Sequence, residues 1–213
     1  MGLIAKDTSN GADFKPVPTG AHIGRCIAVI DMGTQRSVGQ FGESMVHKIQ
    51  IRWEVFGEDE NGLPLTVVYD GKTMPMTVRK TYTLSLHEKA ALRRDLQAWR
   101  GKAFTDEEAL GFDVSKLLGQ YCLINVTHSE SGGKTYANVS GLTPVPAAMR
   151  ANKPVGVHPL IMFDLDNPNM DVFNNFHEKL QEAIKASPEW QARARTGGSP
   201  AVAANVEDDD IPF

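Results

Sequence analysis

The sequence has few of the residues on which disulfide frameworks and metal centres depend. Among its 213 residues are two cysteines, Cys26 and Cys122, and six histidines without any short paired spacing. The cysteines are far apart, and each lies in an alternating apolar stretch. We therefore expect two reduced thiols in the core. Without a cluster of metal-ligating residues, neither a metal nor another cofactor is expected.

Long hydrophobic runs are also missing. No apolar segment approaches the ~18 residues that cross a bilayer, and residues 1–7 contain no apolar stretch with a cleavage site. These absences predict a cytoplasmic protein without membrane contact. Hydrophobic residues make up 41% of the chain and charged residues 23%, which argues against wholesale disorder.

Catalytic motifs are incomplete. Gly71-Lys72-Thr73 and Gly133-Lys134-Thr135 resemble the ends of phosphate-binding loops, but the glycine required five residues earlier is replaced by Thr66 and His128. The nearest pair of carboxylates, Asp164 and Asp166, has no nucleophile or base beside it in the sequence. We therefore expect no enzyme.

Positive and negative charges are segregated along the chain. The net charge is −4, and four acids at positions 207–210 account for all of it. Residues 72–102 contain eight basic side chains against two acids, Glu88 and Asp95. The net charge therefore hides a basic segment and an acidic tail, and does not argue against a nucleic-acid ligand.

Alternation of apolar and polar residues predicts a β-rich domain over residues 19–146, preceded by an irregular arm over 1–18. A glycine-rich loop is expected at 31–42, another loop at 70–75, and a hairpin turn at 131–133. The strands are expected at 21–29, 45–56, 65–69, 76–86, 122–127 and 136–142.

Helical periodicity and capping signals predict the remaining elements. A helix is expected over 86–100, with capping-box spacings at Ser85/Glu88 and Thr105/Glu108. Residues 147–195 are expected to form a connector followed by helices at 170–186 and from Pro188, packed back on the sheet. Residues 196–213 are expected to form a flexible acidic tail.

Apart from the short strand at 65–69, five main strands are expected, and the helical segment lies between the third (76–86) and the fourth (122–127). This order predicts the five-stranded oligonucleotide-binding (OB) barrel, with a C-terminal helical extension. The second and third strands of this fold form its usual binding face, and cations with interleaved aromatic side chains suit single-stranded nucleic acid. The predicted DNA-binding residues are Lys48, Arg52, Arg79, Lys80, Tyr82, Lys134, Tyr136, Phe41 and Lys72.

Two alternatives stay open for these residues. Basic side chains on an exposed strand also serve solubility alone. Tyr82 shares its parity with Val78 and Leu84, which favours a core position over a stacking platform.

The C-terminus combines acids with an apolar end. A free carboxylate and an aromatic ring on Phe213 suit an apolar pocket rimmed by basic residues. The predicted partner-binding residues are Asp208, Asp209, Asp210, Ile211, Pro212 and Phe213.

These last six residues resemble the C-terminal tip of bacterial single-stranded DNA-binding proteins, which recruits replication and repair proteins. Upstream, Leu117-Leu118-Gly119-Gln120-Tyr121-Cys122-Leu123-Ile124-Asn125-Val126-Thr127-His128 and Gly133-Lys134-Thr135-Tyr136-Ala137-Asn138-Val139 resemble phage-encoded single-stranded DNA-binding proteins with an OB core. The body does not resemble the bacterial domain, so its tetrameric assembly is not carried over and the oligomeric state stays open.

The resemblance implies a non-enzymatic, sequence-tolerant protein that protects single-stranded DNA during phage replication and recombination. It would recruit replication and repair proteins through its tip. One alternative is a factor that anneals strands or loads a recombinase, and another is an OB-fold adaptor without a nucleic-acid ligand.

Overall fold

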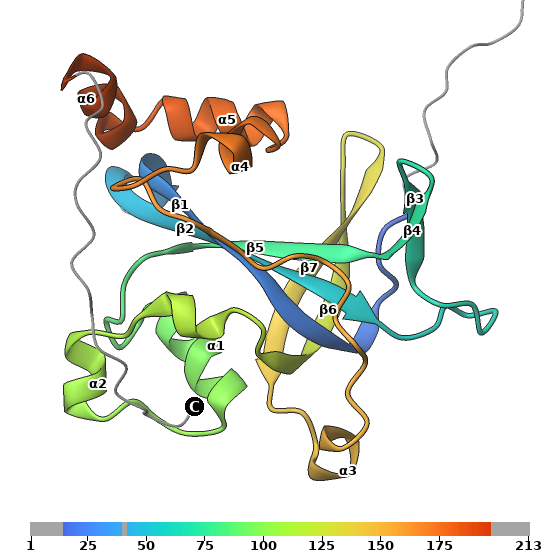
Figure 1. Cartoon of the computed structure of the whole chain (residues 1–213). Coiled ribbons are helices and arrows are strands. Elements are labelled where there is room, and N and C mark those ends of the chain that lie inside the picture. Colours follow the sequence, from blue (N-terminus) through green and yellow to red (C-terminus); the bar gives the residue numbers. More distant parts are fainter. Residues whose placement is uncertain (1–14, 40–41, 197–213) are drawn as a thin grey trace, which may run out of the picture.

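An antiparallel sheet forms the centre of the structure (Figure 1). The computed structural model describes residues 15–39 and 42–196. Hydrogen-bonded neighbours follow the order β5, β2, β1, β6, β7, and β8 pairs in parallel with β1, while β3 and β4 form a separate hairpin. The strands are β1 (Gly20–Gly39), β2 (Gly42–Phe56), β3 (Thr66–Tyr69), β4 (Lys72–Pro75), β5 (Thr77–Thr83), β6 (Tyr121–Ser131), β7 (Lys134–Thr143) and β8 (Ile161–Phe163).

Helices lie on two sides of this sheet (Figure 1). They are α1 (Ala91–Arg100), α2 (Asp106–Leu110), the 3-10 turn η1 (Val114–Leu117), α3 (Ala147–Arg150), α4 (Met170–Asn174), α5 (Glu178–Lys185) and α6 (Pro188–Thr196). The predicted mainly β architecture with helices is confirmed. Within the described residues no pairing joins β5 to β7, so the sheet is not a closed barrel.

β1 and β2 form one long ribbon where the sequence predicted a short strand and a loop. The prediction of a loop over 31–42 was wrong. Gly33 lies at a shift of register within the β1–β2 pairing, and the pairing does not end there. Gly33 has a φ of +66°, which glycine adopts without strain, and its N–H donates to Asp31 Oδ1 over 2.8 Å. The bulge absorbs the irregularity, and pairing continues to Gly39 and Gly42.

The strand β4, which was not predicted, lies where a loop was expected over 70–75. Asp70 and Gly71 have φ values of 49° and 72°, a pair of positive angles typical of two-residue hairpin turns. Residues 66–75 therefore form a hairpin of their own. The hairpin turn predicted between β6 and β7 is confirmed.

The first core lies between the sheet and α1. Trp53 of β2 and Trp99 of α1 are buried with 5.9 Å between their ring centroids. Cys26 and Cys122 are free and buried in the same core, as predicted. Burial raises the pKa of both thiols, so they act as inert packing residues.

α1 begins later than predicted. Its first residue is Ala91, and the preceding Ala90 offers no side-chain cap. Ser85 Oγ accepts a hydrogen bond from the His87 N–H over 3.2 Å in the preceding loop, so the capping box expected at Ser85 and Glu88 was wrong.

The second predicted capping box lies at the start of α2. The Glu108 N–H donates to Thr105 Oγ1, and Glu108 accepts from the Thr105 N–H. This prediction is confirmed.

Residues 161–196, here called the C-terminal lobe, pack a second core on the opposite face of β1. Phe163 lies 5.9 Å from Phe173 and 5.1 Å from Phe176 between ring centroids. The predicted packing of these helices on the sheet is confirmed. The single helix expected over 170–186 is two helices, because His177 Nδ1 accepts from the Lys179 N–H and starts α5 anew.

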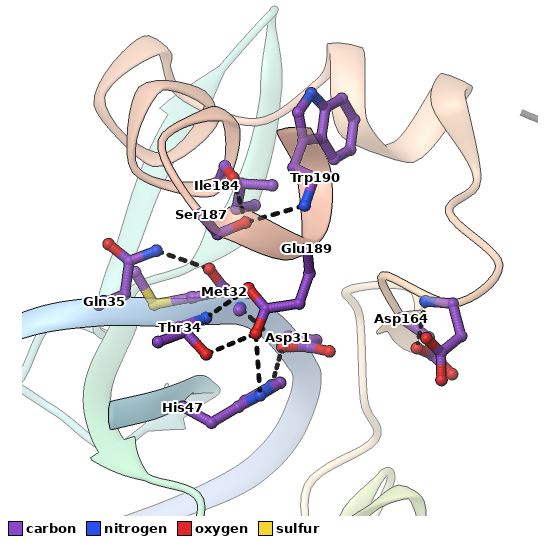
Figure 2. Close-up of polar contacts among 12 residues, drawn as sticks. Asp31, Met32, Thr34, Gln35, His47, Asp164, Ile184, Ser187, Glu189 and Trp190 are labelled. Atoms are coloured by element: carbon purple, nitrogen blue, oxygen red, sulfur yellow. Dashed lines mark hydrogen bonds and ion pairs between the residues drawn. The ribbon is translucent and has the colours of Figure 1, made fainter. Parts of the chain in front are cut away.

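A polar clamp fastens α6 to the β1–β2 ribbon (Figure 2). The carboxylate of Glu189 accepts from the Thr34 N–H over 2.9 Å and from Thr34 Oγ1 over 2.5 Å. His47 lies between two acids, 2.6 Å from Asp31 Oδ1 through Nε2 and 3.8 Å from Glu189 Oε1 through Nδ1. Burial opposes ionisation of Glu189, but its hydrogen bonds with Thr34 outweigh burial and lower its pKa. The clamp therefore holds an ionised carboxylate that fixes the lobe against β1.

Candidate nucleic-acid interface

The outer face of β2 is largely covered, although its alternation predicted an exposed polar face. Glu54 is fully buried, with Arg25 Nε 2.5 Å from Oε1. The backbone N–H groups of Val157 and His158 donate to Glu54 Oε2 over 3.1 and 2.9 Å. Gln50 is also buried. The segment that leads into β8 therefore occupies part of the predicted DNA-binding face.

Arg52 was predicted to bind DNA but lies half-buried beneath the C-terminal lobe. Its Nε donates to Gln50 Oε1 over 2.8 Å, and its guanidinium lies 5.7 Å from the centre of the Phe176 ring. Burial, together with the charge of Arg79 opposite it in β5, lowers the pKa of Arg52 to about 10. Arg52 is therefore chiefly a packing and hydrogen-bonding residue that adds positive potential beside Arg79.

Lys80 and Tyr82 face α1, so their placement on the exposed strand face beside Arg79 was wrong, although Tyr82 also lines a hollow at the C-terminal end of β5. Lys80 Nζ lies 2.6 Å from Asp95 Oδ2 of α1, and the hydroxyl of Tyr82 donates to the same oxygen over 3.0 Å. Tyr82 is 3% exposed, and burial and the Asp95 charge raise its pKa. The buried carboxylate of Asp95 attracts Lys80 to the face of β5 that otherwise carries core residues.

The opposite face of β5 is exposed and carries hydroxyls and a cation. Thr77, Arg79, Thr81 and Thr83 alternate along it, and all four are exposed. Arg79 forms no ion pair within the described residues. The structure thus places Arg79 on an open polar strand face, as predicted.

This face ends in a hollow of about 500 Å³ at the C-terminal end of β5, here called the β5 hollow. Lys48 of β2 and Lys89 of the loop before α1 both line it, and neither forms an ion pair in the described part of the chain. None of the described residues that line the hollow is an acid. Its lining residues are Lys48, Thr81, Tyr82, Thr83, Ser85, His87, Lys89, Ala90 and Ala91.

Lys89 was not among the predicted site residues, although the basic segment over 72–102 contained the signal. Other cations of that segment have intramolecular roles. Arg100 pairs with Glu108 and lies 4.7 Å from the centre of the Phe104 ring, and Arg93 donates to the Leu86 carbonyl. Few cations of this segment lack such an intramolecular contact within the described residues, and Lys89 is one of them.

The other predicted residues lie on separate hairpins or outside the described residues. Lys134 and Tyr136 are exposed on β7, near the β6–β7 turn. Lys72 lies on the separate β3–β4 hairpin, paired with Tyr69 and away from the β2–β5 surface. Outside the described residues lie Phe41 and the tip, Asp208, Asp209, Asp210, Ile211, Pro212 and Phe213.

The described helices include none that is long and apolar enough to cross a membrane. Among residues 15–39 and 42–196, no group of three or more histidine, cysteine or acidic side chains could hold a metal ion. Neither the protein-family models nor the curated proteins compared with this chain give a match.

Proposed function

We propose that this protein binds single-stranded DNA without regard to sequence, performs no catalysis, and uses the outer face of β5 and the β5 hollow as its binding surface. One observation carries the proposal: Arg79, Lys48 and Lys89 are unpaired within the described residues and lie among hydroxyls. Cations of this kind neutralise phosphates and release counterions whatever the base. The exposed Tyr136 on β7 offers a ring on which a base could stack.

The connectivity of the sheet supports an OB-type fold within this proposal. β1 pairs with both β2 and β6, and β5 and β7 extend the sheet on either side. α1, α2 and η1 come between the third main strand, β5, and the fourth, β6. In the OB fold the second and third strands bind the ligand, which corresponds to β2 and β5 here. Phe176 of the C-terminal lobe covers Arg52, and the segment before the lobe covers Glu54, which leaves β5 as the open strand.

Titration with fluorescent oligo-dT tests the binding proposal. Tight binding is expected at low salt, and three cations in contact with phosphate oxygens give a slope of log K against log salt of roughly −2. A larger negative slope would indicate further contacts, with Lys134 the first candidate. A duplex of the same length serves as the control and should bind more weakly, because its bases cannot stack on protein side chains. Absence of oligo-dT binding at low salt would contradict the proposal.

We propose that the tip recruits replication and repair proteins while the sheet protects exposed strands during phage replication and recombination. The resemblance of residues 208–213 to the bacterial tip supports this role. Removing residues 207–213 takes away four acids that repel DNA. Oligo-dT affinity should therefore stay the same or rise a few-fold, while capture of replication proteins from host extract should be lost.

A Phe213→Ala variant provides the matched control for this deletion, because it keeps every side-chain charge of the tail. It should lose capture of the replication proteins with unchanged oligo-dT affinity. Loss of DNA binding on deletion of 207–213 would show that the tail belongs to the DNA site instead.

A further inference from the structure

The β5 hollow has the composition of an anion site. Its two lysines approach from different elements, Lys48 from β2 and Lys89 from the loop before α1. The side chains of Thr81, Thr83 and Ser85 supply hydroxyl groups to the same lining. Among the described lining residues there is no carboxylate that would pair with the two ammonium groups.

His87 adds a ring nitrogen with a defined role. Its Nδ1 accepts a hydrogen bond from the Lys89 N–H over 3.3 Å, so the neutral ring carries its proton on Nε2. Within the described residues Nε2 has no partner, which leaves one N–H donor. The lining therefore offers ammonium, hydroxyl and imidazole donors together.

The position of the hollow links it to the exposed face of β5. Arg79 and Thr83 share that face, about 14 Å apart at the ordinary rise of a strand, and Thr83 already lines the hollow. A polyanion that contacts Arg79 and runs along β5 would therefore bring another of its negative charges to Lys48 and Lys89. Ala90 and Ala91 close the lining where α1 begins without an acid in its first turn, so no carboxylate repels the ligand there.

We infer that the β5 hollow binds a phosphate group of the DNA strand that lies along β5. This inference rests on the proposed function and deepens it, because it states that Lys48 and Lys89 hold one and the same phosphate, separate from the one at Arg79. Lys48 and Lys89 neutralise the phosphate, and the hydroxyls of Thr83 and Ser85 with His87 Nε2 donate hydrogen bonds to its oxygens.

The test is oligo-dT titration of Lys89→Gln at two salt concentrations, with Lys116→Gln as the matched control. Lys116 is an exposed cation of η1 that does not line the hollow. The Lys89 variant should bind about three- to tenfold more weakly at low salt and lose about 0.7 from the magnitude of the salt slope. Lys116→Gln should bind as the wild type does. Thermal unfolding should be unchanged in both, since both side chains are exposed.

A second measurement distinguishes DNA phosphate from a free anion. In amide NMR spectra, oligo-dT should shift the Ala90 and Ala91 signals of the wild type at far lower concentration than inorganic phosphate does. If inorganic phosphate shifts them while Lys89→Gln leaves oligo-dT affinity and salt slope unchanged, the hollow holds a free anion and the inference is overturned.

The failures of the two proposals are distinguishable. Wild-type protein that does not bind oligo-dT would overturn both. Wild-type protein that binds, with Lys89→Gln indistinguishable from Lys116→Gln, would overturn the phosphate site alone and leave DNA binding to Arg79 and the β6–β7 hairpin.

Discussion

Replacing Asp95 with alanine is expected to lower the free energy of unfolding by about 3–5 kcal/mol, the usual cost of removing one partner from a buried ion pair. The carboxylate is 5% exposed and lies 2.6 Å from Lys80 Nζ and 3.0 Å from the hydroxyl of Tyr82. Without it, Lys80 keeps a charge in a half-buried site and Tyr82 loses its acceptor. Urea unfolding at neutral pH measures the loss.

Two further variants separate the contributions to this site. Arg94 also contacts Asp95, at 3.0 Å, but its side chain is 68% exposed, so Arg94→Ala should cost no more than about 1 kcal/mol. Asp95→Asn keeps the shape and removes the charge, and should lie between the two. Equal effects of Arg94→Ala and Asp95→Ala would contradict the assignment of the buried pair.

The pH dependence of stability provides an independent check on Asp95. Burial alone would raise its pKa, but the hydrogen bond and charge of Lys80, with hydrogen bonds from Arg94 and Tyr82, outweigh burial and lower it. The stabilisation is therefore fully present above the ordinary carboxyl pKa and is lost as the pH falls through the lowered value. The difference between wild type and Asp95→Asn should be constant from pH 6 to 8 and shrink below about pH 4.

Local patterns in the sequence predicted much of the sheet, because side-chain parity within a strand depends only on neighbouring residues. The burial of Trp53 and the open position of Arg79 followed from that parity. Lys80 was misassigned because its place depends on Asp95, a residue of α1. An acid between Leu92 and Leu96 in an apolar helical stripe signals a buried partner cation, and this signal could have located Lys80.

The covering of β2 could not be predicted in the same way. Glu54 is satisfied by the N–H groups of Val157 and His158, more than 100 residues later in the chain. Arg52 is covered by Phe176 of the C-terminal lobe. An alternating strand with a polar face looks the same in sequence whether that face meets water or a later segment. The part of the predicted interface that stays open is therefore the outer face of β5 and the β5 hollow, to which β2 contributes Lys48.

Arg79 and Lys80 are adjacent in sequence and lie on opposite faces of β5, so paired variants decide which face binds DNA. Arg79→Glu should reduce oligo-dT affinity about tenfold or more at low salt, because a phosphate contact is lost and a repulsive charge is added. Its free energy of unfolding should change little, since Arg79 is exposed. Removing its repulsion of Arg52 should, if anything, stabilise the fold.

Lys80→Gln should show the opposite result. The folded protein should bind oligo-dT as the wild type does, whereas its free energy of unfolding should fall because Asp95 loses its cation. Fluorescence titration at a temperature where both variants are folded measures affinity, and urea unfolding measures stability. Weaker DNA binding by Lys80→Gln with unchanged binding by Arg79→Glu would place the DNA on the face of the sheet that packs against α1. Neighbouring residues of a strand point to opposite faces. The two variants therefore compare the two faces of β5 at adjacent positions.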